Sequence, residues 1–166
     1  VTRDALEPFR RDPPNRLKPL LPYLRETTPN NLDIAIEAEL SPGGGAPHRI
    51  LRTNARWLYY SAAQQLAHHA LSGCAMETGD LLGSGTISGP DRETWGSLLE
   101  LTWNGRDPLA LGGVTRTFLE DGDLLAGFGP VLFGDGDGLA RHHRHFLHPL
   151  LTVQLGTLLH HWCQSP

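Results

Sequence analysis

Residues 31–40, NLDIAIEAEL, carry the clearest structural pattern in this chain of 166 residues. Apolar side chains occupy every second position of this stretch: Leu32, Ile34, Ile36, Ala38 and Leu40. The positions between them are acidic or small, and alternation with a period of two is typical of a β-strand. We therefore expect a strand with one face buried in the core.

A second strand is expected directly after the first. The glycine run from Gly43 to Gly45 permits a tight reversal of the chain, because glycine adopts backbone conformations that other residues avoid. Residues 48–53, HRILRT, then have the length and composition of a short strand. The two segments together predict a β-hairpin.

The main helix is expected over residues 55–73, ARWLYYSAAQQLAHHALSG. Leu58, Ala62 and Leu66 recur at a spacing of four, which places them on one face of a helix. Asn54 is expected to cap its start and Gly73 to end it.

The remaining segments predict short strands and turns, since the chain contains 19 glycines and 13 prolines. Residues 1–30 are expected to be irregular. Strands are expected at 81–88, 97–103, 108–111 and 115–119, with an acidic turn at 120–123. Residues 125–138 are rich in glycine without alternation, and leucines from Leu147 to Trp162 predict a second amphipathic helix. The predicted fold class is α+β, with a mixed, mostly antiparallel sheet curled into a roll or sandwich and one main helix.

The bulk composition excludes several classes of protein. Lysine and arginine number 14 against 18 acidic residues, so the charge of -4 offers no electrostatic attraction for nucleic acid. No apolar run is long enough to cross a membrane, and the first residues lack the apolar core of a signal peptide. Cys74 and Cys163 have no metal-binding or redox spacing. We expect a cytoplasmic protein.

Residues 59–90, YYSAAQQLAHHALSGCAMETGDLLGSGTISGP, form a long and specific string that is similar to the fumarylacetoacetase family. The resemblance also includes PLLPYL at 19–24, GSLLELTWNGRDPLALGG at 96–113 and TRTFLEDGD at 115–123. It covers residues 1–123, which are expected to be the C-terminal part of a catalytic domain. Residues 124–166 are expected to be a divergent segment rich in glycine and histidine.

The resemblance implies a hydrolase that cleaves a carbon–carbon bond of 4-fumarylacetoacetate to give fumarate and acetoacetate, in tyrosine and phenylalanine catabolism. It also implies a fumarylacetoacetase-type roll and a homodimer acting on a small diketo acid. In such chemistry Ca²⁺ or Mg²⁺ polarises the diketone oxygens, and a histidine held by a carboxylate activates water.

Two residues of this chain match functional positions of the family. Thr86, in GTISGP, matches a threonine that hydrogen-bonds the substrate. Glu100, in GSLLEL, matches the catalytic glutamate that orients and polarises the histidine. Strand alternation would in addition place Glu100 opposite Leu99 and Leu101, so that it could face a cleft while its neighbours pack.

The family's other functional groups match no residue of this chain. Its metal ligands, catalytic histidine and cationic residues lie before the segment that matches Val1, so no metal ligand is assigned here. The first residue is not methionine, and we expect the chain to be part of a longer one. The 166 residues alone are expected to be inactive.

Other readings of the sequence remain open. One is a related hydrolase of 3-oxo acids or acylpyruvates, because a fold is shared more widely than a substrate. Another is a truncated, non-catalytic protein that takes part in interactions. His68 and His69 are expected to pack within a helix. The tail histidines, such as His145 and His148, are expected to bind metal adventitiously, and the acidic turns at 121–123 and 135–137 to be solvated.

Overall fold

The fold is described from a computed structural model, which covers residues 3–131 and 141–147, with side chains for residues 3–127. Its longer elements are β3 (Ala35–Ser41), β4 (His48–Asn54), α2 (Ala62–Leu71), β7 (Leu124–Val131) and β8 (Arg141–Leu147). Every strand pair in the described ranges is antiparallel. The fold is α+β, as the sequence predicts.

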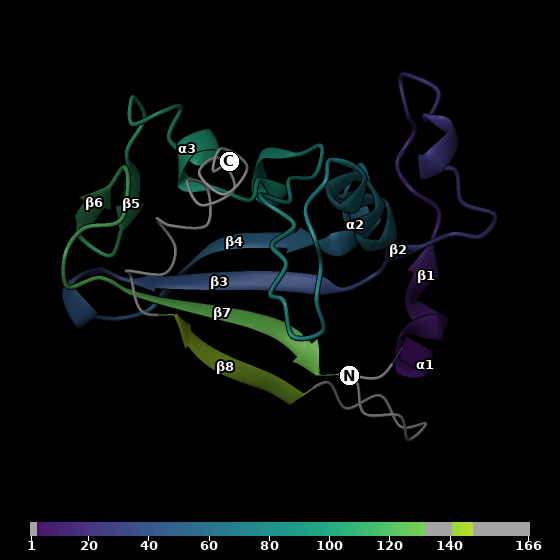
Figure 1. Cartoon of the computed structure of the whole chain (residues 1–166). Helices are drawn as coiled ribbons and strands as arrows, with labels where there is room; N and C mark the ends of the chain where they lie inside the picture. The colour runs from purple at the N-terminus through teal and green to yellow at the C-terminus, as the bar shows by residue number, and fades with distance from the viewer. Residues whose placement is uncertain (1–2, 132–140, 148–166) are drawn as a thin grey trace.

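A four-stranded sheet in the order β4-β3-β7-β8 forms the centre of the molecule (Figure 1). The expected hairpin is confirmed: β3 pairs with β4, and a β-bulge shifts the register between Ala38 and Glu39. The reversal uses positive φ angles of 55° at Gly43 and 75° at Gly44, which glycine tolerates at little cost. Leu40, at the end of β3, is completely buried.

Strand β7 was not expected from the sequence. It pairs with β3 from Glu37 opposite Phe128 to Ser41 opposite Leu124, and with β8 through Gly129 and beyond, so tertiary pairing overrides the low strand propensity of Gly127 and Gly129. The sheet therefore continues past Asp123. The proposed division of the chain at that residue stays a prediction.

The main helix begins later than expected. Asn54 caps a short 3-10 turn, η4 (Ala55–Trp57), by accepting a hydrogen bond from the Arg56 amide. Helix α2 begins after Ser61, whose side chain accepts from the Gln64 amide while Gln64 accepts from the Ser61 amide. This reciprocal capping box fixes the start of α2 more strongly than Asn54 would. Gly73, with φ 95°, follows its end as predicted.

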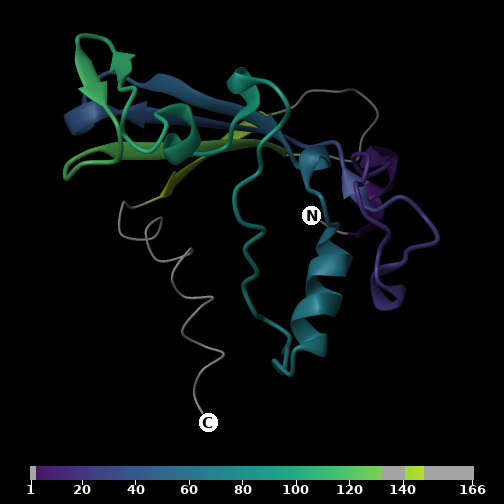
Figure 2. The same ribbon diagram turned by 90° about the horizontal axis from the view of Figure 1, so that it is seen from above.

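Helix α2 projects away from the sheet, and the chain after it runs back beside it (Figure 2). The predicted apolar face of the helix is not buried: Ala62 and Leu66 are exposed. The residue that anchors α2 is polar. Gln64 is 2% exposed, and its Nε2 donates to the Leu24 carbonyl at 2.7 Å. Arg16 also donates to the side-chain oxygen of Gln64. This hydrogen bond ties the N-terminal segment that precedes β3, called the lead-in, to the helix.

The lead-in consists of short elements, in agreement with the irregular start that the sequence predicts. These elements are α1 (Arg3–Leu6), η1 (Glu7–Phe9), β1 (Arg10–Arg11), η2 (Pro22–Leu24) and β2 (Asn31–Leu32). Strand β1 pairs with β2. The interruption at residues 33–34 means that the predicted strand at 31–40 is divided into β2 and β3.

Two predicted strands are wrong. Residues 81–88 have no regular secondary structure, because no described strand pairs with them. Residues 97–103 contain a single helical turn, α3 (Leu98–Leu101), which Ser97 caps. The predicted strand at 108–111 is confirmed as β5 (Leu109–Leu111). The one predicted at 115–119 is confirmed in part, because its counterpart β6 (Val114–Arg116), which pairs with β5, ends before Thr117. The helix expected from Leu147 to Trp162 and the acidic turn at 135–137 lie outside the described residues, apart from Leu147 in β8.

Candidate functional site

The candidate site is built from two segments that lie on either side of a tight loop. The loop turns through η5 (Arg92–Thr94), where the Thr94 amide donates to the Asp91 carbonyl and the Gly89 amide donates to the Thr94 carbonyl. This arrangement brings the end of GTIS, at residues 85–88, against the start of GSLLEL, at residues 96–101. Hydrogen bonds across the loop therefore set the distance between the two predicted site residues.

Gly96 allows the two segments to come into direct contact. A Cβ atom at this position would collide with the backbone carbonyl of Ile87. The Gly96 amide donates to Ser88 Oγ at 3.0 Å. A glycine at residue 96 is required by this close approach of the two backbones.

Glu100 lies in the first turn of α3. Ser97 Oγ accepts from the Glu100 amide at 3.3 Å and thereby caps the helical turn. The sequence Ser97-x-x-Glu100 is the pattern of a capping box, a helix signal that outweighs the strand propensity of the neighbouring leucines. The prediction that Glu100 lies in a strand is therefore wrong.

The neighbours of Glu100 also differ from the expected strand arrangement. Leu101 is buried at 7% exposure, but Leu99 is 56% exposed and Trp103 is 59% exposed. Glu100 itself is half-buried. Its placement beside polar groups comes from the helical turn rather than from alternation.

Two serine hydroxyls hold one oxygen of the Glu100 carboxylate. Ser88 Oγ donates to Oε2 at 2.6 Å, and Ser97 Oγ donates to the same atom at 3.0 Å. Oε1 accepts no hydrogen bond from any residue in the described ranges. The side chain is thus fixed through one oxygen, while the other remains able to accept a hydrogen bond from a further group.

The sequence did not identify Ser88 or Ser97 as site residues. Their role depends on contacts across 12 and 3 residues respectively, and only the second has a local signal, the S-x-x-E pattern. Thr86, the predicted substrate-binding residue, is exposed and lies two residues before Ser88. The structure gives no contact between Thr86 and Glu100, but Ser88 connects their two segments.

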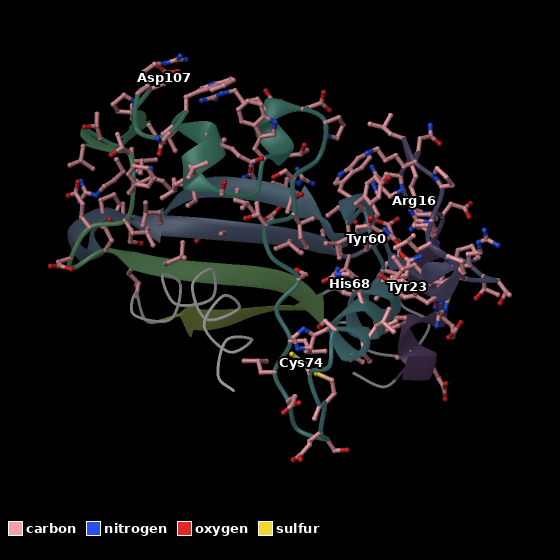
Figure 3. The ribbon with its side chains drawn as sticks, turned by 45° about the horizontal axis from the view of Figure 1, so that its top comes forward. Arg16, Tyr23, Tyr60, His68, Cys74 and Asp107 are labelled. Carbon is pink, nitrogen blue, oxygen red and sulfur yellow. The ribbon has the colours of Figure 1, made fainter. Side chains whose placement is uncertain are left out.

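A second polar cluster occurs where the lead-in meets α2, around Arg16, Tyr23, Tyr60 and His68 (Figure 3). Tyr23 Oη lies 2.8 Å from Nδ1 of His68, and the two rings stack. His68 is exposed, so it binds the lead-in from the surface rather than packing inside.

The adjacent cavity, of about 380 Å³, is lined mainly by apolar and tyrosine side chains and by no carboxylate or histidine. The lining of this cavity therefore contains no carboxylate comparable with that of Glu100.

The described side chains do not form a metal site. No three of their histidine, cysteine, aspartate or glutamate residues are grouped closely enough to hold a metal ion. The side chains of the tail histidines lie outside the described residues.

Among the helices of the described ranges, none has the length and hydrophobicity that a membrane-spanning segment needs.

Comparison with known proteins gives a consistent set of relatives. The chain is 51% identical to the fumarylacetoacetase of Arabidopsis thaliana over 137 residues, which are 82% of this chain and 32% of that protein. It is 58% identical to the fumarylacetoacetase of Aspergillus fumigatus over 130 residues, and 43% identical to that of Homo sapiens over 132 residues. These matches cover 75% and 77% of this chain, and 30% and 32% of the two relatives.

The chain thus spans about a third of the length of the curated relatives that it matches. No family model matches the chain.

Proposed function

We propose, from the premise that this chain belongs to the fumarylacetoacetase family, that it supplies one wall of the active site of a hydrolase that cleaves 4-fumarylacetoacetate to fumarate and acetoacetate. The observation that carries the proposal is the Glu100 carboxylate, which is anchored through Oε2 and has Oε1 unoccupied by described residues. A carboxylate held in this way is suited to bind and orient a basic group.

The chemical role proposed for Glu100 is to orient a histidine contributed by the remainder of the enzyme. A carboxylate that accepts from one ring nitrogen fixes the tautomer, so that the other nitrogen can take a proton from water. The negative charge then stabilises the imidazolium that forms. This requires the carboxylate to keep one position during the reaction, and two hydroxyl donors supply that restraint.

Thr86 is proposed to bind the substrate. It is exposed and its hydroxyl makes no hydrogen bond within the described part of the chain. A threonine hydroxyl both donates and accepts, so it can bind a carboxylate or a keto oxygen of a diketo acid. Its position two residues before Ser88 would place the substrate beside the Glu100 segment.

The metal and the assembly are proposed from the resemblance. Ca²⁺ or Mg²⁺ in the complete enzyme would polarise the diketone oxygens. The described side chains do not fit such an ion, because no three of their histidine, cysteine, aspartate or glutamate residues are grouped closely enough to hold it. We further propose a cytoplasmic homodimer whose subunits each contain a fumarylacetoacetase-type roll.

A chimeric enzyme tests the proposed function. In this chimera, the matched segment of this chain replaces the corresponding segment of the Arabidopsis thaliana fumarylacetoacetase. We expect release of fumarate and acetoacetate at a rate within about tenfold of the parent enzyme. An acylpyruvate substrate should be hydrolysed at least about tenfold more slowly. A chimera that folds and assembles but releases no fumarate contradicts the proposal, and a preference for the acylpyruvate favours the related hydrolase.

A further inference from the structure

We infer that Ser88 is a positioning residue of the reaction, which orients the Glu100 carboxylate and couples it to the segment that carries Thr86. This inference rests on the proposed function, because it assigns Ser88 a role through Glu100. Its basis is the 2.6 Å hydrogen bond from Ser88 Oγ to Glu100 Oε2, the shortest of the polar contacts described at this site.

The direction of this hydrogen bond follows from the other partner of Ser88. The Gly96 amide can only donate, and it lies 3.0 Å from Ser88 Oγ, so the hydroxyl oxygen accepts there. A serine hydroxyl carries a single proton. That proton is therefore directed at Glu100 Oε2. An ionised carboxylate has no proton of its own to donate, so Oε2 is the acceptor.

The direction of the Ser97 hydrogen bond also follows from its two partners. Its Oγ accepts from the Glu100 amide and donates to Oε2. Ser97, however, belongs to the same helical turn as Glu100 and moves with it. Ser88 comes from the other side of the loop, so its hydrogen bond fixes the carboxylate relative to the neighbouring segment.

The carboxylate needs such a restraint because its own torsion angle does not supply one. The last torsion angle of a glutamate side chain, which turns the carboxylate, has a broad distribution without sharply preferred values. Two donors on Oε2, from two different segments, fix the direction in which Oε1 points. Loss of Ser88 would leave Oε2 with the more distant Ser97 donor alone, and Oε1 would lose its fixed direction.

The contact between the two segments makes Ser88 a rigid support. Gly96 lies directly against the Ile87 carbonyl, with no room for a side chain, and Thr86 precedes Ile87. A shift of residues 86–88 would therefore move the Thr86 hydroxyl and the Glu100 restraint together. This links substrate binding to the orientation of the catalytic group.

A double-mutant cycle in the chimera tests the inference. Ser88→Ala should lower kcat about tenfold and leave KM within about twofold, because orientation is lost but substrate contacts are kept. In a Glu100→Gln background, Ser88→Ala should change kcat by less than about twofold, since Ser88 acts through the ionised carboxylate.

Ser84→Ala is the matched control, because Ser84 lies in the same irregular segment as Ser88, is exposed, and donates only to the adjacent Gly85 carbonyl. It should leave both constants within about twofold. Ser88→Cys, which keeps the shape of the residue but has a weak donor, should also lower kcat.

An equal loss of kcat from Ser88→Ala in both backgrounds, or a kcat that does not change, overturns the inference. If Glu100→Gln itself leaves kcat unchanged, the proposed function fails instead. A crystal structure of the Ser88→Ala chimera tests the inference without measuring turnover. We expect the Glu100 carboxylate to be rotated or to occupy several positions. An unchanged, single position overturns the inference.

Discussion

Arg116 donates two hydrogen bonds to the carboxylate of Asp123, from Nε at 2.9 Å and from Nη2 at 3.0 Å. The amides of Glu120 and Gly43 donate two more, so Asp123 joins strand β6, the turn after it and the β3–β4 reversal. The side chain of Asp123 is 1% exposed. The Arg116 hydrogen bond is the main cause that lowers the pKa of Asp123 to about 2.

The low pKa of Asp123 predicts a dependence of stability on pH. Because the folded state lowers this pKa below its ordinary value of 3.8, ionised Asp123 stabilises the fold above about pH 4 and loses this effect as the pH falls towards about 2. Asp123→Asn should reduce the free energy of unfolding by about 2 kcal/mol near neutral pH. Urea unfolding of the chain at several pH values measures this.

The control for this prediction is Asp107→Asn. Asp107 pairs with Arg106 at 2.9 Å, but both side chains are exposed, so the substitution should leave the free energy of unfolding nearly unchanged. A loss of stability from Asp123→Asn that is as large near pH 2 as near pH 7 would contradict the assignment to the ionised carboxylate.

Gln64 should contribute to stability as a buried polar centre. Gln64→Ala removes the donor to the Leu24 carbonyl and the acceptor of the Ser61 amide, so it should lower the free energy of unfolding by about 2 to 3 kcal/mol. Gln65→Ala, in the same helix, removes a hydrogen bond to Tyr60 at an exposed position and should cost less than about 1 kcal/mol. Equal effects of the two substitutions on chemical unfolding would be evidence against an anchoring role for Gln64.

Gly96→Ala should disturb both stability and catalysis. The new Cβ would meet the backbone of Ile87, which cannot move away without shifting Ser88, so we expect a loss of more than about 2 kcal/mol in stability and a lower kcat in the chimera. Gly85→Ala is a useful comparison, since Gly85 has φ 74° and open space around it. Its cost should be the conformational one of about 1 kcal/mol. Wild-type stability and kcat in Gly96→Ala would show that the two segments need not touch.

Thr86→Val tests substrate binding separately from the Glu100 network. The substitution keeps the shape of the side chain and removes its hydroxyl. One lost neutral hydrogen bond, worth about 1 kcal/mol, should raise KM of the chimera about fivefold and leave kcat nearly unchanged. Steady-state kinetics that show a change in kcat alone would remove Thr86 from the substrate site.

Local patterns were sufficient to predict the β3–β4 hairpin. The alternation that ends at Leu40 and the glycines of the reversal act within about twenty residues. Strand β7 could not be predicted in this way, because Gly127 and Gly129 break the alternation and the strand exists through its pairing with β3 and β8.

The start of α2 and the state of residues 97–103 were misjudged for a common reason. Ser61-x-x-Gln64 and Ser97-x-x-Glu100 both follow the pattern of a capping box, and each precedes a helix. At each start the polar capping pattern outweighs the propensity of the apolar residues nearby. The capping pattern is therefore the local signal that indicates both helices.

Glu100 and Thr86 were assigned through the family resemblance, and their roles stay predictions. The structure adds Ser88 and Ser97, which no local pattern assigns to the site, because hydrogen bonding across a 12-residue loop is a tertiary property. A serine in a glycine-rich loop has many possible partners, and its neighbours in sequence do not choose among them.

The most direct test of this account is the kcat of the chimera with Glu100→Gln. The substitution keeps the shape of the side chain and one acceptor oxygen but removes the charge that stabilises the histidinium. We expect kcat to fall about a hundredfold to ten-thousandfold, or about 3 to 5 kcal/mol, with little change in KM. A folded Glu100→Gln chimera with kcat within about threefold of its parent would contradict the account, because Glu100 would then only cap a helical turn.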